Sequence, residues 1–226
     1  MFKYVFLDLD GTLTDPFLGI TNSVKYALKK FNIDAINEEL KCFIGPPLVD
    51  SFIDYYDFTY EDAIKAKEYY REVYSTKGLF ENEIYSNTEK VLKELKKLGC
   101  TLVLATSKPE KFSIQILKHF NIYDYFSFCA CATLDETRNK KGQVIKYAID
   151  SLNITNNNEI LMVGDRFHDV VGAKENDIKS CYVTYGYGSV DEAKKYGANY
   201  IIDDFNDLIK IIKDSIWYCL NKTDKN

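Results

Sequence analysis

The sequence predicts an α/β fold, with a Rossmann-like three-layer core built on a central parallel sheet and an inserted all-α domain. Short apolar segments alternate with amphipathic segments over most of the 226 residues, and this pattern is typical of parallel strands joined by crossover helices. Residues 16–81 interrupt the alternation with helical patterns alone. With 46% hydrophobic residues, the chain can bury a sizeable core together with an insert.

The expected strands are short apolar runs that end in polar residues or a turn. The first, KYVFLDL, contains a continuously apolar VFL stretch, so we expect it to lie in the centre of the sheet, buried on both faces. The strands are predicted at residues 3–9, 101–106, 127–131, 160–164, 181–184 and 200–202.

Amphipathic helices are expected between these strands. The clearest pattern is TEKVLKELKKL at 88–98, where Asn87 or Thr88 can cap the helix start and Gly99 can end the helix. The others are predicted at 110–120, 142–152 and 169–176. Residues 1–15 and 82–226 are therefore predicted to form the α/β core domain.

The inserted domain is predicted to span residues 16–81 and to be helical throughout. Gly45-Pro46-Pro47 is expected to separate two of its helices. We expect Lys77–Asn87 to be a polar return linker and Asn221–Asn226 to be a frayed tail. The insert helices are predicted at 18–31, 37–43, 47–56 and 60–76.

Composition excludes several classes of function. The net charge of -5 argues against a nucleic-acid partner, which needs clustered Lys and Arg. No apolar run approaches the roughly 20 residues of a spanning helix, and the N-terminus has no signal-peptide pattern. The six cysteines are expected to be reduced thiols without a metal or redox role. We therefore expect a cytoplasmic protein that binds neither nucleic acid nor membrane.

The stretch YVFLDLDGTLTD at residues 4–15 ends an apolar strand in carboxylates, Asp8 and Asp10. Open parallel sheets place their ligand sites beyond the carboxyl ends of the strands. Two neighbouring carboxylates repel each other and resist burial. Because Mg²⁺ is commonly bound by one or two carboxylates together with a substrate phosphate, the pattern indicates a metal-and-phosphate site.

Other strand ends carry matching chemistry. Strand 160–164 leads into Asp165 and Asp169, and strand 101–106 leads into Ser107-Lys108-Pro109 before a helix. Hydroxyls and free backbone N–H groups at a helix start can bind an anion. Each feature alone is an ordinary turn or cap. Taken together, in this order along an α/β alternation, they indicate phosphoryl transfer.

These segments resemble the four motifs of the haloacid dehalogenase superfamily of phosphatases. Asp8-Leu9-Asp10-Gly11-Thr12-Leu13 resembles the first motif, DxDGT[LV], and Thr106 resembles the second. Lys141 resembles the third, and Gly164-Asp165 with Asp169 resembles the fourth. The resemblance spans about residues 3–212. The insert, IGPPL at 44–48 and TSKP at 106–109 resemble the phosphoglycolate phosphatase-like branch, which has a small helical cap.

The resemblance implies a catalytic role for both first-motif aspartates and a requirement for Mg²⁺. Asp8 would be the nucleophile that forms an aspartyl-phosphate, and Asp10 would be the general acid and then the general base. The metal would be bound by Asp8, Asp165 and the backbone carbonyl of Asp10. Asp169 would bind it through water or orient its ligands.

The resemblance also implies a phosphate clamp. Thr106 and the Ser107 amide would hold phosphate oxygens, while Lys141 would neutralise Asp8 and the phosphoryl charge. Lys140 remains the alternative for that lysine. Gly11 and Lys108 are expected to support the site, and Lys108 is also a candidate substrate contact.

The implied function is Mg²⁺-dependent hydrolysis of a small phosphorylated metabolite: a phosphoglycolate-like ester, a sugar phosphate or a nucleoside monophosphate. The alternative is a sugar-phosphate mutase of the β-phosphoglucomutase type. Such mutases often carry Glu-Asp where this chain has Gly164-Asp165, which favours hydrolysis. A non-catalytic phosphate-binding regulator is less favoured, since a mere phosphoryl acceptor has no need of Asp10. The sequence leaves open whether the protein is a monomer or a dimer.

Overall fold

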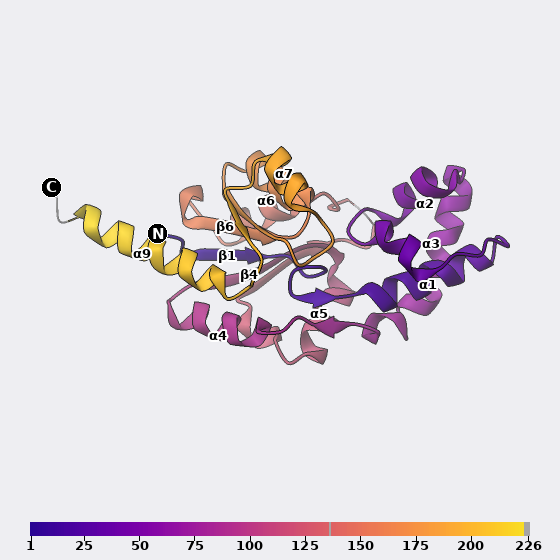
Figure 1. Ribbon diagram of the computed structural model, residues 1–226, viewed down its shortest axis with the longest axis horizontal. Coiled ribbons are helices and arrows are strands. Elements are labelled where there is room, and N and C mark those ends of the chain that lie inside the picture. The colour runs from indigo at the N-terminus through magenta and orange to yellow at the C-terminus, as the bar shows by residue number, and fades with distance from the viewer. Residues whose placement is uncertain (136, 224–226) are drawn as a thin grey trace. The chain divides into compact units, whose positions relative to one another are not determined.

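The computed structural model describes residues 1–135 and 137–223 (Figure 1). The chain forms two compact units. The larger unit comprises Met1–Leu13 and Ile84–Asn226, and the smaller comprises Thr14–Glu83.

The larger unit contains a parallel sheet with six strands among the described residues, in the order β5-β4-β1-β6-β7-β8. The predicted strands are all present, and β1 lies between β4 and β6 as expected. Leu7 of β1 pairs with Leu104 on one side and Val163 on the other. The strands are β1 (Tyr4–Leu7), β4 (Thr101–Pro109), β5 (Phe128–Ala132), β6 (Ile160–Gly164), β7 (Lys179–Val183) and β8 (Tyr200–Ile202). The predicted α/β fold with a central parallel sheet is thereby confirmed.

Helices cover both faces of this sheet, with α6 and α7 on one face and α4 on the other (Figure 1). The predicted helices are present, although α6 and α7 begin one and two residues earlier than expected. Their bounds are α4 (Thr88–Lys97), α5 (Glu110–His119), α6 (Lys141–Ser151) and α7 (Phe167–Glu175). The prediction omitted α8 (Val190–Tyr196) and α9 (Asp207–Thr223).

The sheet is buried on both faces, which explains why its strands are continuously apolar in sequence. Phe6, Val103 and Met162 pack against α6 residues Val144 and Ile145, and all five are inaccessible to solvent. This packing fixes the register of β1 against its neighbours, and so fixes where the residues that follow β1 emerge.

The smaller unit is helical and is packed around aromatic side chains. Phe43 and Phe52 are buried with ring centroids 5.0 Å apart. A short ribbon of β2 (Thr14–Asp15) and β3 (Glu83–Ile84) forms where the chain passes between the units. The helical elements are α1 (Phe17–Lys29), η1 (Asn37–Phe43), α2 (Leu48–Tyr56), α3 (Tyr60–Tyr74) and η2 (Gly78–Phe80).

The segment expected to be a plain return linker contains η2 and β3. The Gly19 amide donates to the Glu81 carbonyl oxygen at 2.9 Å. A Cβ on Gly19 would lie 1.9 Å from the Gly78 carbonyl oxygen. The missing side chain therefore allows this segment to pack directly on α1, a contact that its polar sequence did not indicate.

The expectation of a frayed tail from Asn221 is wrong for its first three residues, because α9 extends through Thr223. The Asn221 side-chain amide donates to the Trp217 carbonyl oxygen at 2.8 Å. The remaining tail residues, 224–226, lie outside the described part of the chain. Among the described helices, none is both long enough and apolar enough to cross a membrane.

Candidate active site

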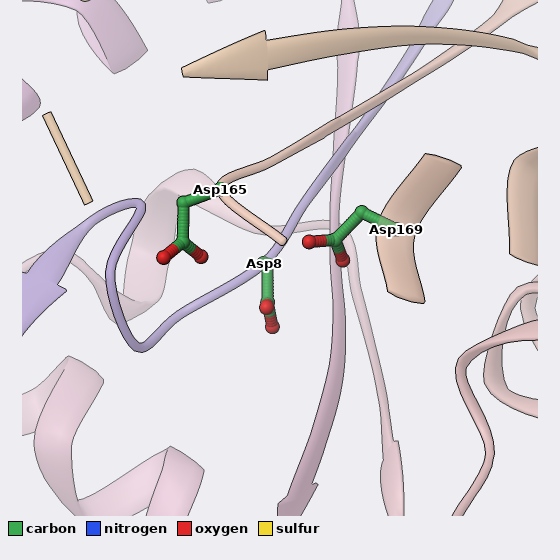
Figure 2. Close-up of side chains that lie close together, drawn as sticks. All are labelled: Asp8, Asp165 and Asp169. Carbon is green, nitrogen blue, oxygen red and sulfur yellow. The ribbon is translucent and has the colours of Figure 1, made fainter. Parts of the chain in front are cut away.

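Three carboxylates converge beyond the carboxyl ends of two adjacent strands. Asp8 directly follows β1, and its amide donates to the Val163 carbonyl oxygen of β6 at 3.0 Å. Asp165 follows β6, and Asp169 lies in the first turn of α7. One carboxylate oxygen from each of the three lies within 4.8 Å of the others, and Figure 2 shows the side chains gathered around a common space.

Lys141 provides a positive charge within this cluster. Its Nζ lies 2.8 Å from Asp8 Oδ1 and 2.9 Å from Asp169 Oδ1, and it donates to the Ala105 carbonyl oxygen at 3.0 Å. Although burial acts to lower the pKa of Lys141, Asp169 and Asp8 raise it above its ordinary value. Lys140, one residue earlier, is exposed. The Lys141 ammonium group therefore stays charged beside Asp8.

Asp10 points to a different lysine. Lys108 Nζ donates to Asp10 Oδ2 at 2.6 Å, and the two side chains are only 7% and 15% exposed. Asp10 Oδ1 has no hydrogen bond within the described part of the chain. Burial raises the pKa of Asp10, while Lys108 acts in the opposite direction. The two influences suit a carboxyl group that has to give up and regain a proton.

The Thr106–Pro109 segment continues β4 beyond its predicted end. Thr106 is buried, and its Oγ1 accepts from the Lys108 amide at 3.2 Å. The pairing of β4 with β5 shifts register between Thr106 and Pro109. Ser107 is partly buried at this irregularity, just before α5. The structure thus places the predicted phosphate-clamp residues at a strand end next to β1.

Two glycines allow the carboxylates to approach so closely. Gly11 has φ +77°, and a Cβ there would lie 2.1 Å from Asp165 Oδ2. A Cβ on Gly164 would lie 2.0 Å from Asp169 Cγ. Any larger side chain at either position would push a carboxylate out of the cluster.

The donor set fits a hard divalent cation. Burial raises the pKa of Asp165, and the charge of Asp169 adds to that effect. Burial also raises the pKa of Asp169, although Lys141 acts in the opposite direction. Lys141 pairs with only two of the three carboxylates, Asp8 and Asp169, and all three offer oxygen donors of the kind preferred by Mg²⁺. A bound divalent cation would offset the remaining negative charge.

The sequence prediction missed a loop that contacts this cluster. Between β7 and α8, the Tyr187 amide donates to Asp165 Oδ2 at 2.7 Å. The Tyr185 hydroxyl donates to the Thr12 carbonyl oxygen at 2.8 Å. The available signal was YGYG at 185–188, since paired glycines after a strand often mark close backbone approach.

The haloacid dehalogenase-like hydrolase family model matches residues 5–183. The chain is 38% identical to a 5'-nucleotidase from Pseudomonas aeruginosa, over 92% of this chain and 95% of that protein. It is also 36% identical to the tyrosine-protein kinase PtkA of Mycobacterium tuberculosis, over 84% of this chain and 64% of that protein.

A solved structure is similarly related. The crystal structure of a predicted phosphatase from Clostridium acetobutylicum superimposes with a TM-score of 0.91 at 47% identity, covering 95% of this chain and 99% of that one. The family match covers β1 from Val5 onward and the whole of β6, the strands that lead into Asp8 and Asp165.

Proposed function

The chain belongs to the haloacid dehalogenase-like hydrolases and is a phosphoric monoester hydrolase, and on that premise we propose that Asp8 is its nucleophile. The reaction would be Mg²⁺-dependent hydrolysis of a small phosphomonoester through an aspartyl-phosphate. The observation that carries the proposal is the position of Asp8, which lies beside the Lys141 ammonium group and within 4.8 Å of two further carboxylates.

Asp8, Asp165 and the backbone carbonyl of Asp10 would hold Mg²⁺. Asp169 would bind through water or orient the ligands. When bound, the metal supplies positive charge that reduces repulsion between a carboxylate nucleophile and the phosphoryl oxygens.

In the first half-reaction, a carboxylate oxygen of Asp8 forms a bond to phosphorus while the bond from phosphorus to the leaving oxygen breaks. The Asp10 carboxyl donates its proton to that oxygen, and the alcohol leaves. Lys141 stabilises the negative charge shared by Asp8 and the phosphoryl oxygens. Thr106 and the Ser107 amide hold the phosphate in line.

In the second half-reaction, water attacks the phosphorus of the aspartyl-phosphate. Asp10, now ionised, accepts a proton from the water, and Asp8 departs as a carboxylate with release of inorganic phosphate. The contacts of Asp10 support both roles, because Lys108 favours its ionised form while burial favours its neutral form.

The substrate is proposed to be a small phosphorylated metabolite, selected by the Thr14–Glu83 unit acting as a cap. Nucleoside monophosphates are the first candidates to test, since a relative that spans 92% of this chain is named a 5'-nucleotidase. Sugar phosphates and phosphoglycolate-like esters follow. We propose a cytoplasmic protein without nucleic-acid or membrane partners, present as a monomer or a dimer.

A turnover assay tests this proposal. Purified protein is incubated with p-nitrophenyl phosphate, with and without Mg²⁺, and then with a panel of nucleoside, sugar and two-carbon phosphate esters. We expect Mg²⁺-dependent phosphate release and a ranking of the esters by kcat/KM. No turnover of any ester, together with no beryllofluoride adduct at Asp8, would defeat the proposal.

Besides hydrolysis, the same phosphoryl-transfer chemistry could pass the phosphoryl group to a sugar or to a protein, and both alternatives can be tested. A sugar-phosphate mutase would return an isomeric sugar phosphate in place of inorganic phosphate when supplied with its bisphosphate. Because one relative is named a tyrosine kinase, incubation with labelled ATP is also informative. Label retained on tyrosine would indicate transfer to protein, whereas label released as phosphate supports hydrolysis.

A further inference from the structure

The end of β7 also takes part in the site without supplying a proposed metal ligand. The loop Tyr185–Gly188 follows β7 and lies against both loops that carry carboxylates. The Tyr187 amide donates to Asp165 Oδ2 at 2.7 Å. The Tyr185 hydroxyl donates to the carbonyl oxygen of Thr12, in the loop after β1, at 2.8 Å. One short segment therefore ties the loop after β1 to the loop after β6.

The two glycines of this loop make the approach possible. A Cβ on Gly186 would lie 2.4 Å from Asp165 Cβ and 2.4 Å from the Gly11 carbonyl oxygen. A Cβ on Gly188 would lie 2.2 Å from the Asp165 carbonyl oxygen. The loop backbone therefore leaves no room for a side chain at either glycine. It approaches the side chain of Asp165 at Gly186 and the main chain of Asp165 at Gly188.

Glu192 of α8 holds the segment between Asp165 and Asp169 through Phe167. Its Oε1 accepts from the Phe167 amide at 2.8 Å and from the Tyr182 hydroxyl at 2.9 Å. The helix start is itself fixed, since Ser189 accepts from the Glu192 amide at 3.1 Å. The residues that follow Asp165 are therefore anchored by α8, and Asp165 itself is anchored by the loop that leads into α8.

We propose that the Tyr185–Gly188 loop and Glu192 form a brace that positions Asp165 and thereby sets the affinity of the protein for Mg²⁺. This inference rests on the proposed function, in which Asp165 is a metal ligand. Tyr187 fixes one carboxylate oxygen, so the orientation of the other is determined before the metal arrives. Partners of a metal ligand act in this way, and their loss commonly costs about 10- to 100-fold in metal affinity.

The direct test is the dissociation constant of Mg²⁺, measured by titration calorimetry without substrate. In Gly186→Ala, the added methyl would displace Asp165 or Gly11. We expect its Mg²⁺ dissociation constant to rise about 10- to 100-fold. Tyr185→Phe removes a single hydrogen bond, so its dissociation constant should rise about 2- to 10-fold.

Turnover separates positioning from a general structural role. In both variants, excess Mg²⁺ should restore phosphate release, and KM for p-nitrophenyl phosphate at saturating Mg²⁺ should match the wild type. A loop that served only stability would change the unfolding midpoint and leave the Mg²⁺ dependence unmoved.

Matched controls lie elsewhere in the same unit. Gly99→Ala introduces a methyl at φ +83° with no atom within 4 Å, so it adds backbone strain without touching the site. Tyr125→Phe removes a surface hydrogen bond in which the Tyr125 hydroxyl donates to Glu89 Oε1 at 3.0 Å. Both should bind Mg²⁺ within about twofold of the wild type, since neither alters a partner of a metal ligand.

A folded Gly186→Ala protein with the wild-type dissociation constant would overturn the brace. If that variant does not fold, Tyr185→Phe and Tyr182→Phe carry the test, and unchanged Mg²⁺ affinity in both would overturn it equally. Failure of the proposed function has a different signature, because wild-type protein would then neither bind Mg²⁺ nor hydrolyse phosphate esters, and the brace would fall with it.

Discussion

Replacing Lys108 with Met tests the buried ion pair on which the general acid–base role proposed for Asp10 depends. Met keeps much of the apolar stem and removes the ammonium group. The change leaves the Asp10 carboxylate, 15% exposed, without the partner that lies 2.6 Å away. Removing one member of a buried pair costs about 3–5 kcal/mol, because the other charge remains buried without compensation. We therefore expect the free energy of unfolding of Lys108→Met to fall by about that amount near neutral pH.

The pH dependence of this loss has a definite sign. Burial raises the pKa of Asp10, and Lys108 opposes that rise, so the variant should have a still higher pKa at this carboxyl. The folded variant then binds more protons than the unfolded chain. Its stability falls as pH rises through the folded pKa. The deficit relative to wild type should be larger at about pH 8 than at about pH 5.

Lys97→Met is the matched control for this measurement. Lys97 and Glu94 are also 2.6 Å apart, yet their side chains are 60% and 38% exposed. An exposed pair contributes about 0–1 kcal/mol, so the same chemical change should have little effect there. Urea unfolding of both variants at the two pH values provides the comparison. If Lys108→Met costs no more than Lys97→Met at either pH, the buried-pair reasoning is refuted.

Four further outcomes follow from the site and the core. Asp8→Asn should lower kcat by about 10⁴-fold or more while circular dichroism stays unchanged; ordinary turnover would exclude the covalent route. Lys141→Met should lower kcat about 10²- to 10³-fold, because Asp8 and Asp169 lose their shared cation, and a smaller loss in steady-state assays would remove Lys141 from that role. Chelation with EDTA should abolish turnover, and Mg²⁺ at about 100 times its dissociation constant should restore it and stabilise the fold by about 2.7 kcal/mol in urea unfolding; activity that survives chelation would contradict the metal site. Met162→Ala should cost about 2–5 kcal/mol, because this side chain is fully buried, and its kcat per folded molecule should match the wild type; a small cost would contradict the packing described around α6.

The parts of the fold that could be predicted are those set by local pattern. The VFL stretch of β1 and the apolar run Ile160–Gly164 are buried, so their composition alone predicted both as strands and the first as a central one. Helix α4 was equally clear, because its apolar residues recur on one face and Gly99 follows it. The proximity of the aspartates at the ends of β1 and β6 could also be predicted, since adjacent parallel strands end at the same edge of the sheet.

The features that were missed depend on contacts between distant segments. In sequence, Gly186 is an ordinary turn residue. Only the structure shows that a Cβ at this position would collide with Asp165. Lys108 was expected to support the site and was a candidate substrate contact. Its pairing with Asp10 could not be predicted, because it depends on β4 continuing to Pro109 with a register shift. Residues Asn221–Thr223 were expected to fray because they are polar, while α9 carries its helical bonding through them.

The most direct measurement of the central claim is the chemical state of Asp8 during a single turnover. Protein in excess over a phosphate ester and Mg²⁺ would be quenched in acid at successive times, digested and analysed by mass spectrometry. A phosphoryl group should appear on the peptide that carries Asp8, decay as inorganic phosphate is released, and be absent from Asp8→Asn. Release of inorganic phosphate at the wild-type rate with no modification of that peptide at any time would contradict the claim.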